Sequence, residues 1–151
     1  MIAVVGPGDT ADASLLAAAE QVGALLARAG HQVVTGGLGG VMAAAARGAR
    51  RAGGTAVALL PGDDPAAAND SSDVVVATGL GQGRNVLVVR SAAAVIAVGG
   101  SWGTLSEVAL ARRLGRPVVW LLGWRVEGPD AEVASTTSAE DAVAQTLAGL
   151  R

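Results

Sequence analysis

Short apolar runs rich in β-branched residues alternate with alanine-rich segments of helical period along the whole chain. The runs predict strands and the alanine-rich segments predict helices. Predicted strands occupy residues 2–5, 32–35, 55–60, 73–77, 94–98 and 117–122, and predicted helices occupy residues 12–29, 40–52, 84–92, 103–114 and 138–149. This alternation is typical of a parallel sheet with helices on both faces and right-handed crossovers. We therefore predict one α/β domain over residues 1–151, built on a doubly wound parallel sheet.

Two segments follow neither pattern. Residues 62–73 are polar and rich in turn formers, and they predict either a solvated loop or a lid over a ligand site. The acidic residues of this loop fit a solvated surface better than a metal site, and we predict no metal site. Residues 123–136 are also predicted to be irregular and to cover an edge of the sheet.

Four glycine-rich turns follow four of the predicted strands. They are Gly6-Pro-Gly8, Gly36-Gly-Leu-Gly-Gly40, Gly79-Leu-Gly-Gln-Gly83 and Gly99-Gly-Ser-Trp-Gly103. The carboxyl ends of parallel strands meet at one edge of a sheet, where open α/β sheets bind ligands. The alternative is that tight strand-to-helix turns favour glycine for conformational reasons alone. We expect a ligand at this edge, with contacts from Gly36, Gly37, Gly39, Gly40 and Gly83.

The last of these turns carries the clearest chemical signal, because a helix is predicted to begin at about Gly103. A helix start presents free N–H groups and a positive dipole end, which attract phosphate, and glycine lets the backbone approach a ligand closely. Glu107 is expected in the first turn of the helix. The dipole is expected to hold that carboxylate ionised, as a base or cation stabiliser rather than an acid. The predicted phosphate contacts at this turn are Gly99, Gly100, Ser101, Gly103 and Thr104.

The composition removes several classes of chemistry. All eleven basic residues are arginine, so a lysine Schiff base with pyridoxal phosphate is excluded, and the absence of cysteine excludes thiolate sites. A net charge of −2 argues against a nucleic-acid partner. No apolar run reaches the roughly 18 residues that a membrane span needs, and no leader peptide is evident. We expect a cytoplasmic protein without a membrane partner or a cofactor.

Three ordered motifs carry a resemblance to a known family. They are Thr35-Gly-Gly-Leu-Gly-Gly-Val-Met42, Gly83-Arg-Asn85 and Gly99-Gly-Ser-Trp-Gly-Thr-Leu-Ser-Glu107. Over about residues 1–122 the chain resembles the LOG-like Rossmann superfamily. Its best-known members are cytokinin-activating phosphoribohydrolases, long mislabelled as lysine decarboxylases. The chain length and the run Thr78-Gly-Leu-Gly-Gln-Gly-Arg-Asn85 are more similar to a small bacterial branch related to molybdenum-cofactor carrier proteins.

This resemblance implies a Rossmann-like nucleotide-binding domain in which Arg84 and Glu107 act together. In the hydrolases the matching residues cleave the N-glycosidic bond of a nucleoside 5′-monophosphate such as AMP, releasing the base and ribose 5-phosphate. The resemblance therefore predicts this phosphoribohydrolase activity for the chain. Val98 replaces the proline of the family motif, and Ser106 replaces an acidic residue that is common in the hydrolases. The alternatives are a non-catalytic carrier of a pterin or nucleotide, and a nucleotide sensor. A plain salt bridge between Arg84 and Glu107 is the structural alternative to a catalytic pair.

Two further features bear on ligand and partner. Trp102 lies between the glycines of its turn, where it either stacks on a flat purine or pterin or packs at a subunit contact. Asn85 either hydrogen-bonds the ligand or caps its helix. The helix at residues 84–92 is apolar nearly all round, and the resemblance implies a homodimer or higher homo-oligomer formed through it. Coverage of that helix by residues 123–136 is the alternative.

Overall fold

A computed structural model describes residues 1–128 and 133–151. Every predicted strand and helix is present, with bounds that agree to within one residue. The strands are β1 (Ile2–Val5), β2 (Val33–Thr35), β3 (Ala56–Leu60), β4 (Val74–Ala77), β5 (Ala94–Val98), β6 (Val118–Leu121) and β7 (Ala134–Thr136). The α-helices are α1 (Ala13–Arg28), α2 (Gly40–Arg51), α3 (Arg84–Ser91), α4 (Trp102–Arg113) and α5 (Ala139–Ala148). Two short 3-10 helices, η1 (Pro65–Ala67) and η2 (Gly81–Gly83), lie before and after β4.

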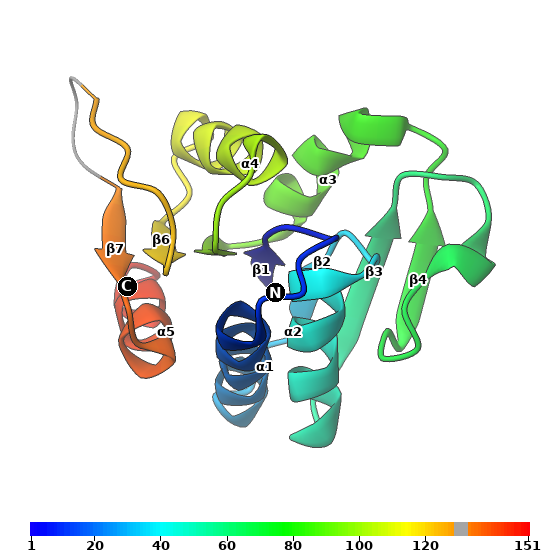
Figure 1. The fold of residues 1–151 in the computed structure, drawn as a ribbon, viewed down its shortest axis with the longest axis horizontal. Helices are drawn as coiled ribbons and strands as arrows, with labels where there is room; N and C mark the ends of the chain where they lie inside the picture. The colour runs from blue at the N-terminus through cyan, green and yellow to red at the C-terminus, as the bar shows by residue number, and fades with distance from the viewer. Residues whose placement is uncertain (129–132) are drawn as a thin grey trace.

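The seven strands form one parallel sheet in the order β4-β3-β2-β1-β5-β6-β7. The prediction of a doubly wound α/β fold is therefore confirmed. Figure 1 shows α1, α2 and α5 on one face of the sheet and α3 and α4 on the other. Successive strand residues point to opposite faces, so Ile2 and Val4 belong to the core under α1, whereas Ala3 and Val5 belong to the core under α3 and α4.

Small residues let α1 and α2 pack unusually closely. A Cβ atom added to Gly48 would lie 1.8 Å from the carbonyl oxygen of Glu20, and one added to Gly23 would lie 2.0 Å from the carbonyl oxygen of Ala45. The abundant alanine and the scarcity of aromatic residues therefore have a structural cause on this face, because larger side chains would push the two helices apart.

Two sequence-based predictions need correction. Residues 123–136 are not wholly irregular, because β7 adds a parallel edge strand there, with Val119 opposite Ala134 and Leu121 opposite Thr136. Thr137 with Glu140 three residues later resembles a capping box and predicts a cap at Thr137 for the final helix. The cap is instead Ser138, whose hydroxyl accepts a hydrogen bond from the Asp141 N–H at 3.2 Å. In the part of the chain that the structure describes, no helix is long and apolar enough to cross a membrane.

Candidate functional site

The candidate site is a cavity of about 170 Å³ at the carboxyl edge of the sheet. It lies where the strand order reverses, since the chain leaves β1 toward α1 on one face and leaves the neighbouring β5 toward α4 on the other (Figure 1). Such a switch point opens a crevice in which α/β proteins bind ligands. Six of the predicted site residues line this cavity, namely Arg84, Asn85, Ser101, Gly103, Thr104 and Glu107.

The start of α4 forms one wall of the cavity. Gly99 has a φ of +67°, which turns the chain sharply at the end of β5, and Ser101 then caps the helix. The Ser101 hydroxyl accepts a hydrogen bond from the Thr104 N–H at 3.1 Å and lies 2.9 Å from the Thr104 hydroxyl. The remaining N–H groups of a first helical turn have no partner within the helix, so this wall attracts an anion.

Arg84, the first residue of α3, brings a positive charge to the same cavity. Its side chain is only 7% exposed, and among the described residues its Nε has no hydrogen-bond partner. A Cβ atom on Gly36 would lie 2.0 Å from Arg84 Nη1, so the glycine leaves the space that the guanidinium occupies. Burial lowers the pKa of Arg84, and the nearby Glu107 carboxylate opposes that shift. A buried guanidinium with an unused donor is suited to bind an anion.

Glu107 differs from its prediction in position and in charge. The helix begins at Trp102, which places Glu107 in the second turn rather than the first, away from the strongest part of the dipole. The carboxyl group is 7% exposed, and burial raises its pKa to about 7 although the charge of Arg84 acts in the opposite direction. The expectation of a carboxylate held ionised by the helix is therefore wrong. Burial is the larger effect, and near neutral pH this group both accepts and donates a proton.

The two buried charged groups do not form the salt bridge that was the structural alternative. Within the described ranges, no oxygen of Glu107 lies within 4.0 Å of a nitrogen of Arg84, although both residues line the same cavity. A buried charge normally has a partner, because its transfer from water is otherwise costly. The arrangement therefore leaves Arg84 free to pair with a ligand anion.

The other predicted contacts lie outside the cavity lining, and most of them, though not the exposed Gly83 and Trp102, pack against the protein itself. Gly37 faces the side chains of Ala58 and Leu60, and a Cβ atom on Gly40 would lie 2.3 Å from the carbonyl oxygen of Pro7. The turn at residues 36–40 is also held by Asn69, whose backbone and side-chain amides donate to the carbonyls of Gly37 and Leu38. Loop 62–73 therefore stabilises this turn through hydrogen bonds and contributes no residue to the cavity lining. The remaining predicted contacts outside the lining are Gly36, Gly39, Gly83, Gly99, Gly100 and Trp102.

Five residues of the lining were not predicted as contacts. They are Gly6, Pro7, Gly8, Asp9 and Met42. Four of them follow β1, and the first three form a glycine-rich turn. This turn can be recognised in the sequence, so it could have indicated these contacts. The strand order was needed to place this turn beside the start of α4. Met42 has the composition of a core residue, and nothing in the sequence distinguishes it from one.

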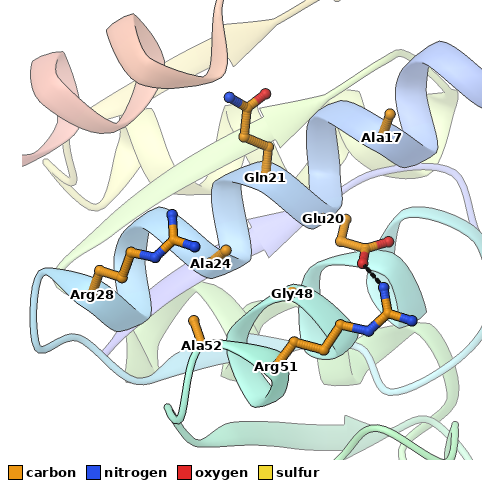
Figure 2. A pocket seen from close by; sticks show the side chains of 8 residues that line it. All are labelled: Ala17, Glu20, Gln21, Ala24, Arg28, Gly48, Arg51 and Ala52. Carbon is orange, nitrogen blue, oxygen red and sulfur yellow. Dashed lines mark hydrogen bonds and ion pairs between the residues drawn. The ribbon is translucent and has the colours of Figure 1, made fainter.

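A larger hollow of about 430 Å³ lies between α1 and α2 but has a different character (Figure 2). Two of its charged residues, Glu20 and Arg51, are paired with each other, Glu20 also pairs with Arg47, and Gln21 hydrogen-bonds Glu140. Its other lining residues are mainly alanine, and it extends along the helices away from the carboxyl edge. By volume alone this hollow would be the candidate ligand site. The buried Arg84 with its unpartnered Nε and the start of α4 favour the smaller cavity instead.

Comparison with known proteins agrees with this fold. A solved molybdenum cofactor binding protein from Rippkaea orientalis superposes with a TM-score of 0.89 at 35% identity, covering 97% of this chain and 94% of that one. The molybdenum cofactor carrier protein of Chlamydomonas reinhardtii superposes with a TM-score of 0.83 at 34% identity, covering 99% and 96%. An uncharacterized protein from Archaeoglobus fulgidus is 43% identical over 120 residues, which is 80% of this chain and 78% of that protein.

The fold and the cavity together define a Rossmann-like α/β domain of the LOG-like type, as the three motifs predicted. The model of the SLOG cluster4 family matches residues 1–148. The chain therefore belongs to the SLOG cluster4 family, and its resemblance to molybdenum-cofactor carrier proteins is confirmed by the structural comparison.

Proposed function

We propose that this protein binds a phosphorylated pterin of the molybdenum-cofactor type and carries it without converting it. The observation that supports this proposal most directly is Arg84, a buried guanidinium with an unpartnered Nε beside a helix start. Both features favour an anion, and a phosphate group satisfies both at once. Full-length similarity to proteins described as molybdenum cofactor binding and carrier proteins supports the choice of a pterin.

The sequence also contains a reason to prefer a carrier. Ser106 stands where the hydrolases commonly have an acidic residue, and its hydroxyl donates to the carbonyl oxygen of Gly103 at 2.7 Å within its own helix. The start of α4 therefore offers one carboxyl group fewer for acid–base chemistry than it does in those hydrolases. Binding requires only anion-attracting groups, and Arg84 and the start of α4 are suited to that role.

Loading with the cofactor tests the proposal. The protein is incubated under anaerobic conditions with molybdenum cofactor released from a molybdoenzyme and is then re-isolated. Molybdenum and pterin are measured in the protein fraction. We expect retention by the wild type and at least a tenfold loss with Arg84→Ala, while Arg90→Ala on the exposed side of the same helix retains the cofactor. Absence of retention by the wild type would contradict the carrier proposal.

Phosphoribohydrolase activity is the second candidate, because Arg84 and Glu107 line one cavity as that reaction requires. In this reaction water forms a bond to the anomeric carbon, the bond from that carbon to the base nitrogen breaks, and the base leaves with a proton. Glu107, with a pKa near 7, is suited to exchange the proton, and Arg84 to hold the 5′-phosphate. Incubation with AMP should then release adenine and ribose 5-phosphate, and Glu107→Gln should abolish the release.

The homodimer predicted through residues 84–92 remains a proposal. Within the monomer α3 is half covered, with Val88 and Val89 buried and Leu87 37% exposed. Light scattering of the purified protein tests it, and a mass of about twice the 14.7 kDa of one chain is the expected result.

A further inference from the structure

All the aromatic side chains of this protein gather at one place. The chain has three tryptophans and neither phenylalanine nor tyrosine. Trp120 is fully buried in β6, and its indole N–H donates a hydrogen bond to the carbonyl oxygen of Gly99. Trp124 stacks on Trp120 with ring centroids 6.3 Å apart, and Trp102 meets Trp124 edge to face at 5.3 Å. The three rings thus lead from the core to the surface beside the turn at residues 99–103.

This turn is shaped to hold the middle ring. A Cβ atom on Gly100 would lie 2.2 Å from Trp124 Nε1, so glycine is needed there because the indole occupies the space. Trp124 therefore has Trp120 on one side and the backbone of Gly100 against its edge. Fixed rings lose little conformational freedom when a ligand packs on them, which favours binding.

Trp102 is unusually exposed for so large an apolar side chain. Its side chain is 80% exposed, although an indole has a large apolar surface. It is the first residue of α4 and lies between Ser101 and Gly103, both of which line the cavity. The backbone of Trp102 therefore adjoins the anion cavity, while its ring lies outside the lining, against Trp124.

The cavity is too small for a complete nucleotide or pterin phosphate. Its volume of about 170 Å³ is below the roughly 300–1,000 Å³ of pockets that enclose a drug-sized ligand. It has room for a phosphate and a few adjoining atoms. A flat ring system attached to that phosphate must lie outside the cavity, against its rim.

We propose that Trp102, supported by Trp124, stacks on the flat nitrogen heterocycle of the ligand whose phosphate enters the cavity, and so determines which ligands bind. The inference rests on the proposed function, since it places the ring of the same ligand. Purines and pterins share the required chemistry, a planar bicyclic heterocycle. Stacking of such a ring on an aromatic side chain changes affinity by about 5- to 100-fold when the aromatic residue is replaced by alanine.

The test compares ligands with and without a ring. Ribose 5-phosphate, AMP and 6-hydroxymethylpterin phosphate are titrated against the wild type, Trp102→Ala and Trp102→Phe by calorimetry. We expect Trp102→Ala to weaken binding of the preferred ring-bearing phosphate by about 5- to 100-fold and to leave ribose 5-phosphate unaffected. Trp102→Phe should recover most of the loss. Whichever of AMP and the pterin phosphate shows the effect identifies the ring. Stacking of a heterocycle on Trp102 should also lower the intrinsic fluorescence of the wild type. The change is readily seen because tryptophan is the only aromatic fluorophore in the chain.

The outcomes separate this inference from the proposed function. If the wild type binds ring-bearing phosphates and Trp102→Ala binds them equally well, the stacking inference is wrong and the anion site stands. If the wild type binds none of the three phosphates, both fail. If Trp102→Ala changes only the mass in light scattering, Trp102 is a subunit contact and the inference is overturned. Thermal unfolding serves as the folding control, and little change is expected for so exposed a side chain.

Discussion

The turns at residues 36–40 and 99–103 are alike in sequence but differ in their surroundings in the structure. Both follow a buried strand, both precede a helix, and both contain several glycines. At the first, a Cβ atom on Gly40 would meet the backbone of Pro7 and Gly8, and the Val41 N–H at the start of α2 donates to the Pro7 carbonyl at 3.0 Å. At the second, a Cβ atom on Gly103 would meet, among described atoms beyond its chain neighbours and its own helix backbone, only Ser101 Oγ at 3.7 Å.

The difference shows what a glycine-rich turn does and does not reveal. Glycine marks a place where the backbone approaches something closely or takes a positive φ. Near Gly40 the backbone that approaches closely is the protein's own turn after β1. Gly103 instead borders a cavity, where a ligand has room to approach. The pattern therefore predicts close approach, and only the packing tells which group approaches.

Replacing one glycine in each turn should give the largest contrast. Gly40→Ala puts a side chain at a φ of +55° and against backbone, and we expect it to lower the free energy of unfolding by about 2–4 kcal/mol. Gly103→Ala has room and lies in a helix, so a change within about 1 kcal/mol is expected. Urea denaturation measures both, and equal losses would show that the two turns do not differ as described.

The buried carboxyl group should make stability depend on pH. The folded protein keeps a proton on Glu107 up to a pKa of about 7, whereas the unfolded chain releases it near the ordinary value of 4.5. The stability of the wild type relative to Glu107→Gln should therefore fall as pH rises from about 4.5 to 7, by roughly 3 kcal/mol in all, and then level off. Denaturant midpoints of the two proteins across this range provide the measurement. A difference that does not vary with pH would mean that Glu107 is not buried as described.

Binding should depend on the guanidinium at the cavity rather than on positive charge elsewhere on α3. Arg84→Ala should weaken binding of a phosphate monoester by about 10- to 100-fold, because a charge-assisted hydrogen-bond donor is lost. Arg84→Lys keeps the charge without the planar fork and should give an intermediate affinity. Arg90→Ala, an exposed arginine of the same helix, is the matched control and should bind as the wild type does. Equal weakening by Arg84→Ala and Arg90→Ala would indicate non-specific attraction.

Two serine caps offer the finest comparison. Ser101 caps α4 at the cavity and Ser138 caps α5 away from it, each through its hydroxyl and the N–H three residues later. Ser101→Ala and Ser138→Ala should each lower stability by about 1 kcal/mol. Only Ser101→Ala should also weaken phosphate binding, by a few-fold. If both variants bind like the wild type, the start of α4 does not contact the anion.

The sequence predicted most of the fold because alternating apolar periods determine strands and helices locally. It missed β7 because Ala134–Thr136 is short and mainly exposed, with no apolar alternation to reveal it. It identified Arg84 and Glu107, but it could not give the pKa of Glu107, since burial depends on neighbours far away in the chain. The pairing of β1 with β5, which brings Asp9 near Thr104, is also non-local. The sequence therefore did not identify the residues of the turn after β1 as part of the cavity lining.

A map of amide shifts on titration with ribose 5-phosphate tests the central claim most directly, because it reports on both turns at once. We predict nitrogen–proton shifts at the amides of residues 101–104 and at Arg84 Nε, with the amides of residues 36–41 and of the hollow between α1 and α2 little changed. Shifts concentrated at residues 36–41, with the start of α4 unaffected, would contradict the assignment of the anion site.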